Sequence, residues 1–366
     1  MSIKPTRTEA SRPANRWTAA IGIGAAVLLV CGLALAMPGT VLEASIRGLS
    51  IWWEVLFPAL FPFFVLSELL LGFGVVHMAG TLLDPLMRPL FRIPGLGGFV
   101  LAMGTVSGYP VGARITSRLM EQGLVSRSEG ERLVAMTTTS DPIFLIGAVC
   151  TGFFGRPGIA AVLAAAHYGG AIGLGLLLRW TVPKAAAERG QAKPAGGRLR
   201  LALQAMHRAR LADGRPFAQM LEQALRSSLQ LMIVVGGLVV FFSAGLEVLT
   251  ASGLLDLLRD AFGWLLHRFG LARELSVALV QGTFEVTLGA RAASGAGLLG
   301  TLPSLQDRVA AAAFVLSWAG LSVHAQVAGL MSRTSWRYGP FLRARLLHAL
   351  LAVLLVYALW PVLYRG

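Results

Sequence analysis

The stretch that decides the fold is GTVSGYPVGAR, residues 104–114, which interrupts a strongly apolar part of the chain with Gly, Ser, Pro and Arg. A second stretch with the same outline, GTFEVTLGAR, covers residues 282–291. Backbone groups that leave a helix inside a bilayer have no water to bind, so such a break must face protein or a water-filled cavity. Two similar breaks therefore predict a polar chamber built from two copies of one motif.

The composition is that of a membrane protein. Of 366 residues, 55% are hydrophobic and only 14% are charged, which is too little polar surface for a soluble globular domain of this size. Several apolar runs approach the roughly 20 residues needed to cross a bilayer. The predicted spans are residues 17–36, 51–76, 159–180, 228–250 and 346–363. We expect an all-α polytopic membrane protein.

The basic residues explain the net charge of +14 without a nucleic-acid partner. They gather at the ends of the spans, as the positive-inside rule requires, and include Arg343 and Arg345 before the last span. The first apolar run follows a basic flank and ends in an Ala-Leu-Ala sequence, like a signal peptide. It is longer than the 7–15 residues of a secretory signal, so we predict a retained span and a cytoplasmic N-terminus. Cys31 and Cys150 lie in apolar runs and are predicted to be core residues, not a disulfide.

A polar, basic segment divides the chain into two similar halves. Gly104 matches Gly282, Gly112 matches Gly289, and Glu131 matches Asp307, all at nearly constant separation. The predicted organisation is a tail and first span at 1–40, a first repeat at 41–182, a cytoplasmic linker at 183–216, and a second repeat at 217–366.

Each half has the same order of parts: a span, an amphipathic stretch, a Gly-broken segment, a helix broken at its middle, and a closing span. The charge rule makes the span at 51–76 run inward and the span at 228–250 run outward. We therefore expect an inverted repeat with re-entrant or broken helices, an arrangement typical of secondary transporters.

The first break is predicted to be a short helix at 96–106, a turn at 107–110 and a new helix at 111–122. The N-terminus of that new helix would favour an anion. Its candidate substrate-binding residues are Ser107, Gly108, Tyr109 and Arg114. In the alternative reading, the glycines only allow close packing and Arg114 is a positive-inside residue.

The next helix, residues 128–149, is predicted to begin at a capping box of Ser128 and Glu131 and to break at TTTSDP, residues 137–142. Asp141 is either the N-cap of the second half-helix or a carboxylate that binds a proton or cation near the midplane. Thr139, Ser140 and Asp141 are the candidates from this break.

The second half supplies an equivalent set of polar residues. Its candidates are Glu285, Thr287 and Arg291 in the Gly-broken segment and Ser322, His324 and Gln326 in the middle of the crossing helix at 306–332. His324 either exchanges a proton or makes a helix–helix contact. The sequence holds no nucleophile–base pair, P-loop or metal cluster, so we predict no enzyme activity, no metal and no cofactor.

Six stretches together carry a family resemblance: FPFFVLSELLLGFG (61–74), SGYPVGAR (107–114), EQGLVS (121–126), SDPIFLIGAV (140–149), HYGG (167–170) and GLSVHAQV (320–327). The chain resembles the YlbJ-type, or SpoVV-type, sporulation integral membrane proteins from about residue 51 onward. Members of that family carry two nucleoside-recognition Gate domains, so the resemblance implies an architecture like that of concentrative nucleoside transporters. Where many members have an amide-rich stretch, this chain has three threonines at 137–139.

The resemblance implies transport of dipicolinic acid across the outer forespore membrane during endospore formation. Dipicolinate is a planar dianion, and we expect the break at 107–114 to hold one carboxylate and the break at 285–291 the other, through arginine forks. Glu285 would then be protonated or face away, which would fit coupling to a proton or cation. The alternatives are a nucleoside or nucleobase transporter and a non-transporting sporulation scaffold. The bilayer is a predicted partner, as is a second copy of the chain.

Overall fold

A computed structural model describes residues 14–181, 197–296 and 302–364, and every regular element in these ranges is a helix. The all-α fold class is thereby confirmed. The predicted N-terminal tail at 1–13 and the first part of the predicted linker, 182–196, lie outside the described residues.

The first half of the chain contains one helical hairpin and one broken helix. Its elements are α1 (Ala14–Ala36), α2 (Pro38–Ser50), a π-helix η1 (Ile51–Leu56), α3 (Phe57–Gly72), α4 (Val75–Phe91), α5 (Leu96–Ser107), α6 (Tyr109–Glu121), α7 (Arg127–Thr137), a π-helix η2 (Phe144–Phe153), η3 (Pro157–Ile159), α8 (Ala160–Leu178) and η4 (Arg179–Thr181). Pro38 begins α2 where a missing N–H costs nothing, and the chain bends by 102° there.

The second half repeats the order of the first. It contains α9 (Arg198–Asp213), α10 (Phe217–Ala251), α11 (Asp256–Arg268), η6 (Arg273–Leu275), α12 (Ser276–Phe284), α13 (Val286–Ala293), α14 (Leu305–Trp318), α15 (Gly320–Met331) and α16 (Tyr338–Leu363). The hairpin α12/α13 corresponds to α5/α6, the broken helix α14/α15 to α7/η2, and α16 to α8. The repeat expected from the sequence is confirmed.

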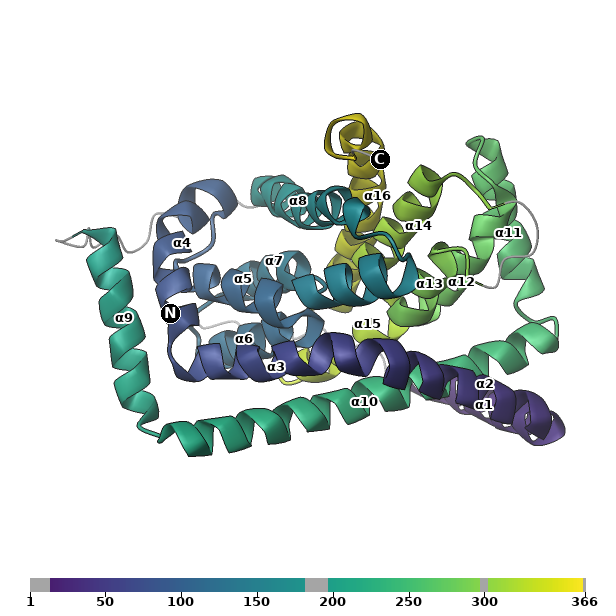
Figure 1. The fold of residues 1–366 in the computed structure, drawn as a ribbon, viewed down its shortest axis with the longest axis horizontal. Coiled ribbons are helices and arrows are strands. Elements are labelled where there is room, and N and C mark those ends of the chain that lie inside the picture. The colour runs from purple at the N-terminus through teal and green to yellow at the C-terminus, as the bar shows by residue number, and fades with distance from the viewer. Residues whose placement is uncertain (1–13, 182–196, 297–301, 365–366) are drawn as a thin grey trace, which may run out of the picture.

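Four helical segments of the described chain are long and apolar enough to cross a membrane, or up to six if two bent pairs each count as one span. The longest, α10, has 35 residues, about 52 Å at 1.5 Å per residue, more than the roughly 30 Å of a hydrocarbon core. It follows the long axis of the molecule along one edge (Figure 1) and packs against α2 and α3. These helices form a wall, and the hairpins and broken helices lie beside it.

Two local expectations need correction. The capping box at the start of α7 is formed by Ser126 and Glu129, not by Ser128 and Glu131. Two overlapping Ser-x-x-Glu patterns were available, and Glu131 is instead taken by Arg337, which donates from its backbone and its guanidinium at 3.0 Å. Cys150 is buried as expected, but Cys31 is exposed on α1.

Candidate functional site

The tip of the first hairpin is a single glycine. Gly108 has φ 80° and ψ −173°, a backbone conformation that is essentially restricted to glycine. Tyr109 and Pro110 then begin α6, where proline has no helical N–H to lose. A Cβ at Gly108 would lie 3.1 Å from the Asp141 Oδ2 atom, so the hairpin tip lies directly against the break in the neighbouring crossing helix.

That crossing helix unwinds between α7 and η2, and Asp141 caps the part that follows. Its Oδ1 atom accepts hydrogen bonds from the N–H groups of Ile143 at 3.0 Å and Phe144 at 2.8 Å. Through its Oδ1 atom, Asp141 is therefore the N-cap of the half-helix that follows, which is one of the two roles that the sequence allowed. The other oxygen lies toward Gly108 at the hairpin tip.

The carbonyl end of α7 is satisfied by a buried arginine that we had predicted to be a cytoplasmic charge. Arg345 of α16 is fully buried and donates to the carbonyl of Thr138 and, at 2.8 Å, to that of Ala135. A cation at the C-terminus of a half-helix also complements its partial negative charge. Arg345 lies near the start of a predicted span, where charge counting cannot distinguish an inward side chain from an exposed one.

The second break is a tight kink in which α14 ends and α15 begins. Ala319 has φ 76° and Gly320 has φ 69°, and a Cβ at Gly320 would lie 3.0 Å from the carbonyl oxygen of Phe284. The Tyr109 hydroxyl donates to the carbonyl of Leu316 at 2.9 Å. The first hairpin tip thus satisfies the end of the helix in the other half.

His324 serves the same kink and does not line the cavity described below. Its Nε2 atom is 3.0 Å from the carbonyl oxygen of Trp318, and its Nδ1 atom is 2.9 Å from the Tyr338 hydroxyl. A carbonyl only accepts, so Nε2 carries the proton and Nδ1 accepts from the tyrosine. The structure therefore shows the helix–helix contact that the sequence left as an alternative to proton exchange.

The second hairpin is capped by an acid. Glu285 has an extended backbone, and its Oε2 atom accepts from the N–H of Leu288 at 2.9 Å, so it is the N-cap of α13. The two legs of the hairpin touch through glycine, because a Cβ at Gly289 would lie 2.3 Å from the Cα atom of Gly282. The GxxxxxxG spacing of this segment thus reflects close packing of α12 on α13.

A cavity of about 100 Å³ opens between the two hairpins and the two broken helices. The structure brings together there eight of the predicted residues: Ser107, Gly108, Tyr109, Asp141, Glu285, Thr287, Ser322 and Gln326. The opposite side is apolar and comes from the wall, through residues such as Phe64 of α3 and Val235 of α10. A ligand pocket usually measures 300–1,000 Å³, so the cavity in this conformation is smaller than a usual ligand pocket.

The cavity contains two carboxylates and, among its described lining residues, no arginine. The arginine forks predicted from the sequence are therefore not formed in this conformation. Arg114 is exposed and has an electrostatic interaction with Glu68 of α3. It lies five residues beyond Tyr109, about 7.5 Å along α6 and about 140° around it, and it is not among the residues that line the cavity. Arg291 lies in the last turn of α13, away from the cavity.

Thr139 and Ser140 lie behind the break, not in the cavity. The N–H of Ser140 donates to His167 Nε2 at 3.0 Å, and its carbonyl accepts from the Tyr168 hydroxyl at 3.1 Å. Thr139 is buried, and its hydroxyl has no partner among the described residues. Of the two residues, Ser140 thus connects the backbone of the break to α8.

Sequence reasoning missed a buried polar chain that connects the two breaks. Arg345 donates to His348 Nδ1 at 2.9 Å, and His348 Nε2 donates to the carbonyl of His167 at 2.8 Å. His167 Nδ1 lies 2.9 Å from the hydroxyl of Ser317, in the last turn of α14. Since His167 Nε2 already accepts from Ser140, its Nδ1 is the donor. The available signal was the i, i+3 pair Arg345 and His348 within an apolar span.

Comparison of the sequence with known proteins assigns the chain to a family. The sequence profile Gate, described as nucleoside recognition, matches residues 53–156 and 232–335, one segment in each half. The sporulation integral membrane protein YlbJ of Bacillus subtilis (strain 168) is 42% identical over 340 residues, which cover 93% of this chain and 82% of that protein. An uncharacterized protein of Alkalihalophilus pseudofirmus is 36% identical over 91 residues, 25% of this chain and 18% of that protein.

Among solved structures, CNTnw in an inward-facing substrate-bound state superposes with a TM-score of 0.54 at 14% sequence identity. The match covers 94% of this chain and 87% of the other. At this identity the likeness concerns the fold alone, and it confirms the expected architecture of a concentrative nucleoside transporter.

Proposed function

The chain belongs to the YlbJ family of sporulation integral membrane proteins and contains the Gate module twice, and from this premise we propose that it is a secondary transporter of a small polar organic molecule. The observation that carries the proposal is the cavity between the two breaks, where polar groups from both halves face one another. Discontinuous helices that meet around a central site are the usual substrate-binding arrangement of such transporters.

The cavity argues against the alternative of a sporulation scaffold. A scaffold gains nothing from two carboxylates enclosed in the membrane, because ionisable groups there are costly and are retained mainly for function. Asp141 and Glu285 are both needed as helix caps, but serine or threonine would cap equally well without a charge. The acids therefore support a role in handling cargo or a coupling ion.

Dipicolinate is the first candidate substrate, because the similar protein of Bacillus subtilis is a sporulation protein. A dianion would be repelled by Asp141 and Glu285 in their charged forms, and no arginine of the described lining offsets them. Binding thus requires a proton or cation on these acids, and transport of dipicolinate would be coupled to that ion.

A nucleoside is the second candidate, and the cavity offers it hydrogen-bond acceptors and a ring. Carboxylate, amide and hydroxyl oxygens of Asp141, Glu285, Gln326 and Ser322 can accept hydrogen bonds from sugar hydroxyls. The Tyr109 ring is a surface against which a base could stack. Such a cargo needs no neutralised acid.

Uptake into proteoliposomes tests the proposal. Vesicles containing the purified chain are given labelled dipicolinate or labelled nucleosides, with equal pH on both sides or with the outside more acidic. We expect dipicolinate uptake above that of empty vesicles, and faster uptake when the outside is acidic, since protons on the cavity acids relieve the repulsion. Uptake of nucleosides alone would select the second candidate, and uptake of neither would overturn the proposal.

A further inference from the structure

Helix α9, in the described part of the segment between the halves, has three distinct faces. One face packs on α4: Ala202 is buried, and the carbonyl of Met206 lies so close to Gly74 that a Cβ there would be 2.5 Å away. This face fixes the helix against the protein. The remaining circumference of α9 is exposed and is not explained by the transport site.

A leucine stripe runs beside the packed face. Leu199 and Leu203, four residues apart, are 62% and 44% exposed, and the exposed His207 continues this side of the helix. At 100° per residue, Leu203 lies about a quarter turn from Ala202, so the stripe borders the face that touches the protein. Two neighbouring exposed leucines would be more stable against an apolar surface than in water.

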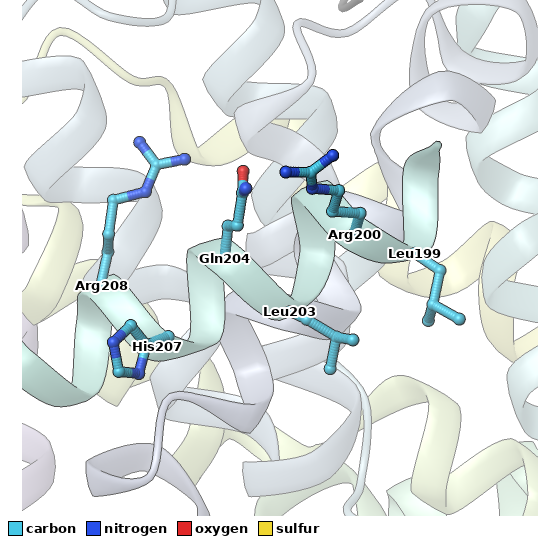
Figure 2. Close-up of a pocket in the computed structure, with 6 residues that line it drawn as sticks. All are labelled: Leu199, Arg200, Leu203, Gln204, His207 and Arg208. Atoms are coloured by element: carbon cyan, nitrogen blue, oxygen red, sulfur yellow. The ribbon is translucent and has the colours of Figure 1, made fainter. Parts of the chain in front are cut away.

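A basic stripe occupies the side of α9 opposite the packed face. Arg200, Gln204 and Arg208 project together to one side of the helix, while Leu199 and Leu203 project to the other (Figure 2). None of the ion pairs among the described residues involves Arg200 or Arg208. Arg210, by contrast, donates to the carbonyl of Arg215 and approaches Asp213 within the protein.

The position of α9 tells which surface could satisfy both stripes. The chain turns at Gly214, with φ 63°, and enters the candidate span α10. Helix α9 lies across the end of α10, at a steep angle to it (Figure 1). Since α10 is long and apolar enough to cross a bilayer, its orientation as a span would place α9 along the bilayer surface at the end where α10 begins.

We propose that α9 is an interfacial anchor whose leucine stripe enters the outer acyl region of one leaflet and whose Arg200 and Arg208 bind the phosphates of anionic phospholipids there. Apolar residues on one side and arginines on the other are the pattern of helices that lie in the membrane interface. The inference does not depend on which molecule the cavity carries.

Depth-dependent quenching tests the insertion of the leucine stripe. The full chain with Cys31→Ser receives an environment-sensitive label at Leu203→Cys, the buried Cys150 being retained, and is placed in vesicles containing acyl-brominated phosphatidylcholine. The matched control is Gln204→Cys, one residue and about 100° further around α9. We expect stronger quenching at position 203. Equal quenching at positions 203 and 204 would overturn the proposal. A label at position 203 that another protein shields from both lipid and aqueous quenchers would overturn it too.

Lipid preference tests the arginines. At equal low mole fraction, brominated phosphatidylglycerol should quench the label at position 203 more than brominated phosphatidylcholine. Each arginine near an anionic surface contributes about a fivefold enrichment, so Arg200→Gln with Arg208→Gln should remove most of the preference. The control removes the same charge from α11, through Arg259→Gln and Arg268→Gln, and should leave the preference intact. A preference that survives the α9 substitutions contradicts the assignment.

Discussion

At the scale of single residues, the first hairpin depends on a glycine for two separate reasons. Gly108 has a backbone conformation that side chains disfavour, and a Cβ would press against Asp141. We expect Gly108→Ala to lower the free energy of unfolding by about 1–3 kcal/mol and to abolish uptake, because the hairpin tip can no longer reach the break. Chemical unfolding in detergent and the uptake assay measure the two effects.

Gly123→Ala is the matched control for that substitution. Gly123 also has a positive φ, of 67°, but a Cβ there meets nothing within 4 Å. The Gly123→Ala substitution should lower the free energy of unfolding only by the backbone cost of about 1 kcal/mol. The variant should retain uptake. If Gly108→Ala behaves like Gly123→Ala in both assays, the close approach to Asp141 has no functional meaning.

The two cavity acids make a prediction about pH. Glu285→Gln and Asp141→Asn keep an oxygen that can accept the capping hydrogen bonds but remove the negative charge. With the repulsion gone, dipicolinate uptake by the double variant should no longer accelerate as the outside is acidified, whereas uptake by the unaltered chain should. A double variant with an unchanged pH profile would show that the coupling proton binds elsewhere.

At the scale of elements, the two broken helices are connected through one side chain of α8. His167 accepts from the N–H of Ser140 in the first break and contacts Ser317 at the second. His167→Ala leaves these buried partners unsatisfied, at about 1–3 kcal/mol for each. We expect a loss of about 2–4 kcal/mol in the free energy of unfolding.

The exposed His267 of α11 is the control for this prediction, and its replacement by alanine should change stability by less than about 0.5 kcal/mol. Thermal or chemical unfolding of His167→Ala and His267→Ala, measured in parallel, tests this prediction. Equal, small effects would mean that the chain from Arg345 to Ser317 does not hold the breaks together.

The sequence predicted the elements well where backbone chemistry was decisive. The hairpin at Gly108, the break after Thr137 and the kink at Ala319 all lie where Gly, Pro or polar residues interrupt an apolar helix. The start of α7 was misplaced because two identical capping patterns overlap and only the tertiary contact of Glu131 with Arg337 separates them. Local rules cannot rank such alternatives.

At the scale of the whole molecule, the candidate site was predictable in part. Residues at the tips of the breaks reached the cavity, because the repeat itself brings the tips together. Arg114 and Arg291 did not, since each lies more than one turn into the following helix. The buried position of Arg345 depends on the packing of α16 against α7 and α8, which no local pattern reveals.

The cavity also sets a condition on the molecule as a whole. Its volume of about 100 Å³ is bounded on one side by the α3 and α10 wall and on the other by the hairpins. The proposed transport of a cargo with a ring therefore requires a conformation in which the wall and the hairpin assembly separate. Loss of function in any variant that cross-links them follows from the same reasoning.

The most direct measurement is the protection of a cavity cysteine by cargo. In the chain with Cys31→Ser, Ser322→Cys on α15 lines the cavity, whereas the equally buried Ser228→Cys on α10 does not. The account predicts that a water-soluble thiol reagent modifies position 322, that a transported substrate slows this modification, and that position 228 stays unreactive. Modification of position 322 that no transported substrate slows would contradict the claim that cargo occupies the chamber between the two breaks.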